Sequence, residues 1–230
     1  MKIDLHVHSE FSPDSRFALD EISTLSEQYE LPVICITDHD SVDGCLKIRE
    51  KYPDLKVLPG MELGLVEGDF LVYSMNIDLL KSMLNRKIKS VFDLPRSAEE
   101  ALVWAHPLTR RFRESDSPFA EGEMLAKVMD HIDGLEVYNS KILIHVTLGQ
   151  EPAGYAENLI QLTRKFGKAA IGGSDSHQFY NYLKAWTQVP PELASAAGVV
   201  EAIRKGLTIP EYDPLFYKQL TDYLEKSARL

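Results

Sequence analysis

The feature that most constrains the fold is a regular alternation of short apolar runs with longer segments of helical periodicity. Val33–Thr37 is a continuous apolar run of strand length, and the preceding segment, Leu19–Glu30, has its apolar residues at helical spacing. Strands that are buried on both faces of a parallel sheet read as such continuous runs. The alternation therefore favours parallel β/α units in a single α/β domain over residues 1–230, either as an open sheet or as a barrel.

The remaining elements follow from the same two periodicities. Further strands are expected at Lys2–His8, Leu55–Leu63, Asp69–Ser74, Gly134–Tyr138 and Ala169–Gly173. Further helices are expected at Asp43–Lys51, Glu121–His131, Pro152–Phe166 and Leu193–Lys205, with a helix and a connecting loop in Asp78–Pro95 and a last helix after Pro210. Ser97–Ala105 is expected to be a helix because SAEE has the pattern of a capping box, although LVWAH could already begin a strand.

Composition narrows the class of protein and of partner. The formal charge of -10 over 230 residues makes binding of extended nucleic acid through general electrostatics unlikely. Two cysteines, Cys35 and Cys45, supply no disulfide framework, which is typical of a reducing compartment. We find neither a membrane-spanning run nor a signal-peptide pattern, so we expect a cytoplasmic protein with no membrane partner. The sequence does not indicate the oligomeric state.

Five of the seven histidines fall at the ends of expected strands or at the start of a following loop: His6, His8, His39, His106 and His177. Carboxylates accompany them in TDHD, GMEL and GSDSH. Each piece alone has a structural explanation, such as strand packing for the His-x-His pair or helix capping for the aspartates. Because the C-terminal ends of parallel strands share one face, the coincidence of all five indicates a metal site. Imidazoles with carboxylates suit zinc, manganese or iron.

Taken in order, the segments DLHVHS, ITDHDS, PGMEL, AHP and GSDSH resemble the PHP (polymerase and histidinol phosphatase) domain family. The resemblance runs from residue 4 to residue 177. It implies a distorted (β/α)7 TIM-like barrel with two or three divalent metal ions at the C-terminal ends of the strands, and hydrolysis of phosphate esters. Carried over by position, it implies ligands for the first metal at His6, His8, Glu62 and Asp175, a second metal between Glu62 and His106, and a third held by Asp14, His39 and His177.

One position departs from the pattern of many relatives. Asp69 stands where those relatives have a histidine that binds the second metal. An aspartate there is a harder oxygen donor, which favours manganese or magnesium over zinc. The alternative is that Asp69 is a turn residue facing solvent, which leaves the second metal in question.

Metal in this site would favour an anionic substrate, because three divalent ions exceed the charge of Asp14, Glu62, Asp69 and Asp175 by two. We therefore expect attack of a metal-activated hydroxide on a phosphate monoester of a small metabolite or nucleotide. The residues expected to act in catalysis are Glu62, Asp175 and His177. Substrate contacts are expected from Asn139, Arg110, Arg111 and Arg113, although the three arginines could equally form a solvated basic loop.

Several alternatives stay open. Asp4 could orient a ligand histidine through its second nitrogen, Asp38 and Asp40 could do so or cap the following helix, and Glu136 could be structural. An amidohydrolase also begins with His-x-His on a barrel strand, but TDHD and GSDSH fit that class poorly. A metal-binding module with little or no activity is the third interpretation.

Overall fold

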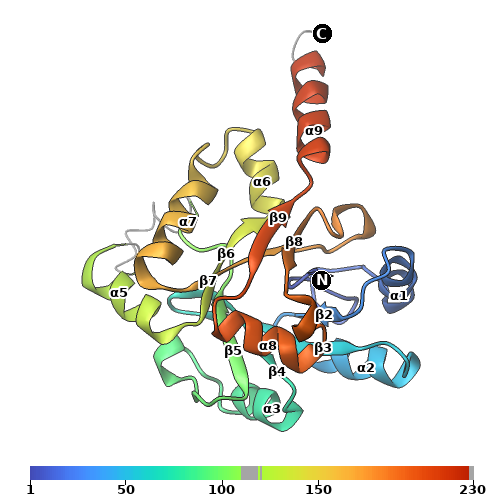
Figure 1. The fold of residues 1–230 in the computed structure, drawn as a ribbon, viewed down its shortest axis with the longest axis vertical. Coiled ribbons are helices and arrows are strands. Elements are labelled where there is room, and N and C mark those ends of the chain that lie inside the picture. Colours follow the sequence, from blue (N-terminus) through green and yellow to red (C-terminus); the bar gives the residue numbers. More distant parts are fainter. Residues whose placement is uncertain (110–118, 120, 228–230) are drawn as a thin grey trace.

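The computed structural model describes residues 1–109, 119 and 121–227, and its core is a curled sheet with helices around the outside (Figure 1). The strands are β1 (Lys2–Ile3), β2 (Ile34–Ile36), β3 (Val57–Leu65), β4 (Gly68–Ser74), β5 (Glu100–Trp104), β6 (Gly134–Asn139), β7 (Ala169–Gly173), β8 (Ala185–Gln188) and β9 (Ile209–Tyr212). The α-helices are α1 (Leu19–Gln28), α2 (Asp43–Lys51), α3 (Ile77–Asn85), α5 (Gly122–His131), α6 (Ser140–Thr147), α7 (Tyr155–Phe166), α8 (Ala196–Arg204) and α9 (Pro214–Ser227).

Six strands form the main sheet, in the order β2-β3-β4-β5-β6-β7. The β2–β3, β5–β6 and β6–β7 pairs are parallel, as the helix–strand alternation predicts. However, β4 is antiparallel to both of its neighbours. The β3–β4 connection consists only of Val66 and Glu67, which is too short for the crossover that a parallel pair needs. The uniform series of parallel units expected from the sequence is therefore interrupted at β4.

The segment after β1 lies between the two edges of this sheet. The carbonyl of Val7 accepts the Thr37 N–H at 2.8 Å at the end of β2, and the His8 N–H donates to Ser176 O at 2.9 Å beyond β7. The Asp175 N–H donates to His6 O at 2.8 Å. Lys2–Ile3 itself pairs antiparallel with β8 in a second sheet, β1-β8-β9. The expected strand Lys2–His8 is thus a short antiparallel strand followed by a segment that brings the sheet edges together at the histidines.

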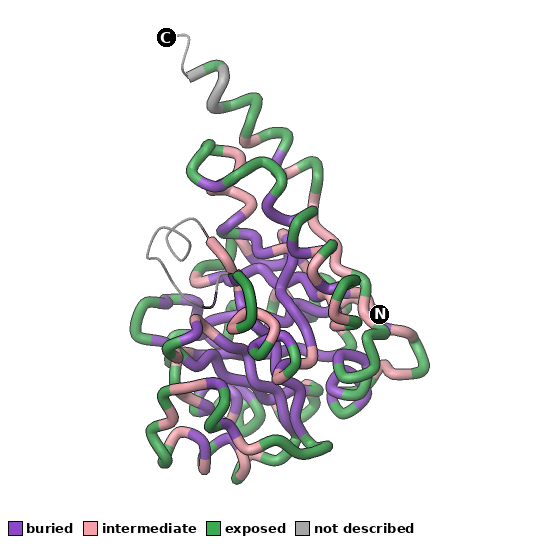
Figure 2. The backbone as a smooth tube through the Cα atoms, turned by 90° about the vertical axis from the view of Figure 1, so that its left-hand side faces the viewer, coloured by how far each residue is buried: buried purple, intermediate pink, exposed green. Residues whose placement is uncertain are grey.

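The inside and outside of the curled sheet follow the side-chain alternation of the strands. Along β5, Ala101 and Val103 face an inner apolar cluster, while Leu102 and Trp104 pack outward against helices. Helix α8 contributes Val199, Ile203 and neighbouring residues to the inner cluster. Most residues of the main-sheet strands are buried, and Figure 2 shows the buried residues in purple at the centre of the molecule, whereas the far part of α9 projects from the body of the molecule.

The expected helix at Ser97–Ala105 is wrong, because residues 100–104 form β5. The Ser97–Glu100 pair does fold locally: the carboxylate of Glu100 accepts the Ser97 N–H at 2.5 Å and also its hydroxyl. The following residues are buried on both faces and pair with β4 and β6. Residues 101–104 are apolar and buried, and they gain more from pairing with β4 and β6 than from forming a helix. The Ser97–Glu100 contact therefore stabilises the turn at the start of β5 and not a helix N-terminus.

Most other elements agree with the sequence to within a few residues, including α1, α2, α3, α5, α7 and α8. Helix α6 and strands β8 and β9 were not predicted, because they are short and their sequences carry no strong periodicity. Among the described helices, none is both long and apolar enough to cross a lipid bilayer.

Candidate metal centre

All five histidines expected at strand ends converge on one site, together with three carboxylates. His6 and His8 come from the segment after β1, and His39 follows β2. Glu62 lies within β3, His106 follows β5, and Asp175 and His177 follow β7. Asp14 comes from the loop that precedes α1. The other two histidines, His131 and His145, lie in α5 and α6. The ligand atoms form three overlapping groups: His6–His8–Asp175, His6–Glu62–His106 and His8–Asp14–His39–His177.

The innermost group has donor atoms spaced as a metal ion requires. His6 Nε2 lies 3.0 Å from His8 Nε2, and these nitrogens lie 3.2 and 3.1 Å from Glu62 Oε2. Asp175 Oδ1 is 3.3 Å from His8 Nε2 and 3.7 Å from His6 Nε2. Ligands bound tetrahedrally to zinc at about 2.0–2.2 Å lie about 3.3–3.6 Å from one another. The spacings among His6, His8 and Asp175, and those from the two imidazoles to Glu62, are therefore close to the spacings of metal ligands.

Glu62 is the carboxylate that connects the groups. Its Oε1 lies 3.1 Å from His106 Nε2, while its Oε2 lies 3.2 Å from His39 Nδ1 as well as near His6 and His8. A carboxylate can give one oxygen to each of two metals, which an imidazole nitrogen cannot. Its position at the centre of the cluster suits the bridging role that the sequence resemblance implies.

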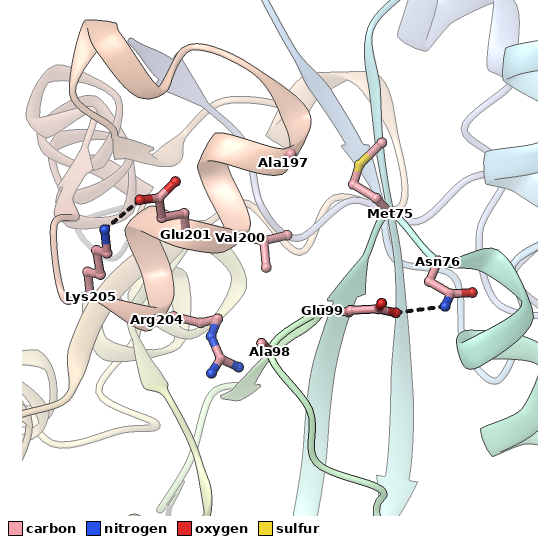
Figure 3. Close-up of a pocket in the computed structure, with 9 residues that line it drawn as sticks. All are labelled: Met75, Asn76, Ala98, Glu99, Ala197, Val200, Glu201, Arg204 and Lys205. Carbon is pink, nitrogen blue, oxygen red and sulfur yellow. Dashed lines mark hydrogen bonds and ion pairs between the residues drawn. The ribbon is translucent and has the colours of Figure 1, made fainter.

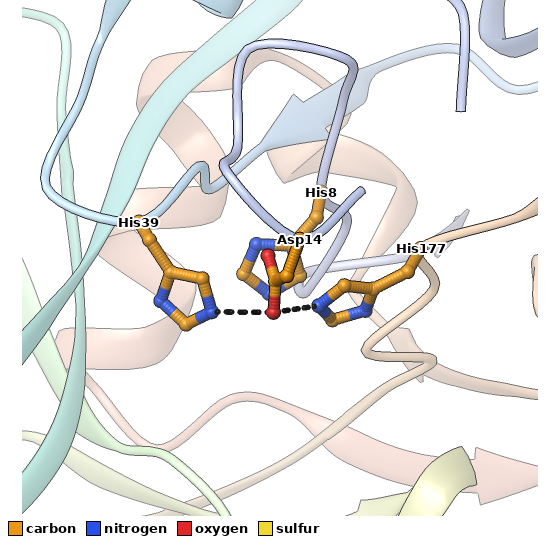
Figure 4. Close-up of side chains that lie close together, drawn as sticks. All are labelled: His8, Asp14, His39 and His177. Atoms are coloured by element: carbon orange, nitrogen blue, oxygen red, sulfur yellow. Dashed lines mark hydrogen bonds and ion pairs between the residues drawn. The ribbon is translucent and has the colours of Figure 1, made fainter. Parts of the chain in front are cut away.

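The outer group consists of His8, Asp14, His39 and His177, with the carboxylate of Asp14 between two imidazoles (Figure 4). Asp14 Oδ2 lies 3.0 Å from His177 Nε2 and 3.5 Å from His39 Nε2. His177 Nδ1 lies 3.0 Å from the carbonyl oxygen of Asp175, and because a carbonyl only accepts, Nδ1 carries a proton.

Burial and nearby His8 hold the pKa of His177 below its ordinary value, which favours the neutral ring. Its Nε2 lone pair then faces the Asp14 carboxylate, which is also an acceptor. At 3.0 Å, either a proton on Nε2 or a metal ion nearby can offset the repulsion between the lone pair and the carboxylate. The outer group therefore also fits a metal ion.

Glu136 holds two of the ligand residues in place. Its Oε1 accepts from His6 Nδ1 at 3.0 Å, which leaves His6 Nε2 free to bind a metal. Its Oε2 accepts the His106 N–H at 2.9 Å and the Asn139 amide at 3.0 Å. Asp4, the other residue considered for this role, instead accepts the backbone N–H groups of Ser174 and Leu183 at 2.8 and 3.0 Å.

Two further residues beside the ligands hold the surrounding segments in place. Asp38 accepts the N–H and hydroxyl of Ser9 at 2.6 and 2.8 Å. Ser12 belongs to none of the sequence motifs, but its hydroxyl lies 3.0 Å from His8 Nδ1 and accepts the His39 N–H at 2.9 Å. A serine three or four residues after a His-x-His pair is too common a pattern to reveal this role from sequence.

Two of the ligand residues have left-handed backbones, His106 with φ 28° and Asp175 with φ 52°. Such angles are costly for residues with a Cβ and persist where the surrounding contacts impose them. The Asp175 N–H donates to His6 O, and the His106 N–H donates to Glu136. These contacts hold the backbone where both side chains lie among the other ligands.

The electrostatics of the metal-free cluster couple its acids and bases. Burial opposes the charged forms, but His6 and the other histidines hold the pKa values of Glu62 and Asp175 well below their ordinary range. Conversely, burial lowers the pKa of His106, but Glu62 outweighs it and raises that pKa to about 9. Without metal, protons on the imidazoles supply the positive charge that the buried carboxylates need.

Asp69 lies beside the cluster, but it is not in any of the three groups. It sits on β4 opposite Gly64 and is partly buried. Burial and the charge of Glu62 raise its pKa above the ordinary value. Asp69 is therefore not the fully solvated turn residue of the alternative interpretation, and its role as a ligand stays a prediction.

Of the four residues expected to contact substrate, the structure describes only Asn139. Arg110, Arg111 and Arg113 lie outside the described residues. Asn139 is buried, and its amide donates to Glu136 at 3.0 Å and to Asp175 Oδ2 at 3.3 Å, while its oxygen accepts the Ile142 N–H at the start of α6. In this arrangement Asn139 supports two carboxylates of the site, and a direct contact with substrate stays a prediction.

A groove of about 820 Å³ lies at the other end of the sheet, between α8 and the start of β5 (Figure 3). Its polar groups already bind one another or the backbone. Arg204 donates to Ser97 O and Glu100 O at 2.8 and 2.7 Å, Lys205 pairs with Glu201, and Asn76 donates to Glu99. The groove holds none of the three histidine–carboxylate groups, which lie at the opposite end of the sheet.

Together, the curled sheet and the convergent ligands define an α/β protein with a buried histidine–carboxylate cluster suited to several divalent metal ions. The PHP domain model matches residues 4–196. The chain belongs to the PHP domain family, as the sequence motifs indicate.

Solved structures with the same fold are distant in sequence. A two-domain protein from Bacteroides vulgatus, which contains a predicted PHP-like metal-dependent phosphoesterase, has a TM-score of 0.65 and 18% identity over 92% of this chain; the chain spans 64% of that protein's length. PsfC from Pseudomonas syringae has a TM-score of 0.61 and 17% identity, covering 99% of this chain and 98% of its own. An amidohydrolase from Chromobacterium violaceum with bound sulfate has a TM-score of 0.56 and 15% identity, covering 88% and 96%. A search of curated proteins gave no match.

Proposed function

We propose that the protein is a metal-dependent phosphoesterase that hydrolyses a phosphate monoester of a small metabolite or nucleotide. The observation that carries the proposal is the central position of Glu62, whose two oxygens lie 3.1 Å from His106 Nε2 and 3.2 Å from His6 Nε2. This arrangement supports two metal ions that share one carboxylate. The outer group around Asp14 supports a third ion beside them.

His6, His8, Glu62 and Asp175 would hold the first ion, Glu62 and His106 the second, and Asp14, His39 and His177 the third. Zinc, manganese or iron bound there would activate water at neutral pH and polarise the phosphate. The protein groups have separate tasks. Glu136 and Ser12 fix the orientations of His6 and His8, while Asn139 fixes Asp175.

Exposure of the ligands suggests the direction from which substrate enters. His6, His8, Glu62 and Asp175 are buried, whereas the side chains of Asp14 and His39 are 50% and 33% exposed. The outer group therefore faces solvent and receives the phosphate first. Glu62, Asp175 and His177 are the residues proposed to act in catalysis, since they connect the outer group to the inner ones.

The test is hydrolysis by metal-loaded protein of a panel of phosphate monoesters, phosphate diesters and amides. We expect the fastest turnover with monoesters, and loss of turnover by about 100-fold or more in Glu62→Gln. Asp54→Asn, at an exposed position outside the cluster, is the control and should match the parent. Amide hydrolysis instead would place the protein with the amidohydrolases. Stoichiometric metal binding without turnover of any substrate would favour a non-catalytic module.

A further inference from the structure

A lysine that the sequence motifs do not mark stands at the edge of the cluster. Lys141 is the second residue of α6, and its Nζ lies 3.9 Å from Asp175 Oδ2. Of the described lysines and arginines, only Lys141 forms an ion pair with a carboxylate of the three ligand groups. Its side chain is 50% exposed, so the ammonium group reaches both the cluster and solvent.

The backbone of Lys141 is held at this place by the same residue that supports the metal ligands. Asn139 caps α6 by accepting the Ile142 N–H at 3.1 Å, and its amide nitrogen donates to Asp175 Oδ2 at 3.3 Å. The start of α6 and the Asp175 carboxylate are thereby joined through one side chain. Asp175 Oδ1 in turn lies 3.5 Å from His177 Nδ1, so Lys141 approaches the cluster from the Asp175–His177 side.

The ammonium group is not satisfied by Asp175 alone. At 3.9 Å the pair is beyond hydrogen-bonding distance, and an ammonium group has three N–H donors to offer. When Asp175 binds a divalent ion, the ammonium group of Lys141 lies across that carboxylate from a like charge. An anion bound between the ammonium group and the metal ion is attracted by both of these cations and offsets their mutual repulsion.

We infer that Lys141 binds the phosphate group of the substrate, and that the site selects esters with a terminal, doubly charged phosphate over diesters. The inference rests on the proposed function and adds a residue and a charge requirement to it. A monoester presents oxygens to the metal ions and a further charged oxygen to Lys141. A diester has esterified that oxygen and carries one negative charge fewer, so it gains less from the lysine.

The experiment compares Lys141→Met and Lys141→Arg with the parent, using p-nitrophenyl phosphate as the monoester and bis(p-nitrophenyl) phosphate as the diester. Lys127→Met is the matched control, because Lys127 is similarly exposed at 54% and pairs with Glu123 on α5. In Lys141→Met we expect kcat/KM for the monoester to fall by about tenfold or more, mainly through KM, and that for the diester by less than about threefold. Lys141→Arg should retain most of the monoester activity because it keeps the charge.

Two further measurements separate the explanations. Calorimetry with inorganic phosphate and metal-loaded protein should show weaker binding to Lys141→Met, by about tenfold, at unchanged metal content. If Lys141→Met loses metal, the lysine only positions Asp175 and the inference is overturned. Equal effects on both esters, or a match between Lys141→Met and Lys127→Met, would also overturn it. If the parent hydrolyses neither ester nor any monoester of the panel above, the proposed function fails, and the phosphate titration still decides the role of Lys141.

Discussion

Glu136 accepts a hydrogen bond from His6 Nδ1 at 3.0 Å, and both side chains are fully buried. The same carboxylate accepts hydrogen bonds from the backbone of His106 and the amide of Asn139. One side chain therefore positions His6 and His106, which contact the two different oxygens of Glu62. Carboxylates that orient metal-bound histidines in this way also raise the basicity of the ligand.

Replacing Glu136 with glutamine should therefore weaken metal binding. An amide group would bring N–H donors against the N–H donors of His106 and Asn139. We expect a loss of metal affinity of about 10–100-fold, measured by competition with a chromogenic chelator, and a lower melting temperature. Glu123→Gln, which alters an 82% exposed carboxylate on α5, should leave both quantities unchanged. Parent-like affinity in Glu136→Gln would show that His6 needs no carboxylate partner.

Metal removal should lower the stability of the fold, because the ions bind the assembled cluster and not the unfolded chain. We expect more than one transition-metal ion per chain by elemental analysis after purification without chelators. Treatment with EDTA should lower the melting temperature by several degrees, and re-addition of manganese or zinc should restore it. An unchanged melting temperature in a protein that carries no metal would contradict this prediction.

The stabilisation by metal should increase as pH rises from 6 to 9. The pKa of His106 in the metal-free cluster is raised to about 9, mainly because Glu62 outweighs the effect of burial. This group stabilises the metal-free fold below its unfolded pKa, and that contribution is lost as pH rises through the folded value. Metal binding must displace the proton, so its affinity rises over the same interval.

The difference in melting temperature between metal-loaded and EDTA-treated protein, measured at each pH unit, tests this coupling. Calorimetric titration of metal at pH 7 in buffers of different ionisation enthalpy should show proton release, which should decrease in His106→Gln. A difference that stays constant from pH 6 to pH 9 would mean that His106 is already neutral in the metal-free protein.

Asp69 should determine the metal preference of the second site. Its raised pKa reflects burial and the nearby charge of Glu62, which a cation would relieve. We expect manganese to support more activity than zinc in the parent, Asp69→His to shift this preference towards zinc, and Asp69→Ala to lose about one ion per chain. Metal stoichiometry and turnover with each ion measure these effects. If Asp69→Ala retains the parent's stoichiometry and turnover, Asp69 is not a ligand.

The sequence by itself determined which residues gather at the site. The ligand histidines and acids stand at the ends of apolar runs, and parallel β/α structure brings such ends to one face regardless of loop detail. His39 and His177 could therefore be predicted to meet although 138 positions separate them, and both lie against Asp14. The order of the motifs also indicated the PHP family, which the match over residues 4–196 confirms.

Only the tertiary structure decided how the chain closes around that site and which neighbours support it. Periodicity indicates which faces are buried but not which strand is the partner, so it could not show that β4 is antiparallel or that the Ser97–Glu100 pattern leads into a strand. Glu136 and Lys141 carry no local signal, because their roles depend on contacts with His6 and Asp175, which are far away in sequence. Burial and charge at such contacts are properties of the packed molecule, and they arise only when distant segments meet.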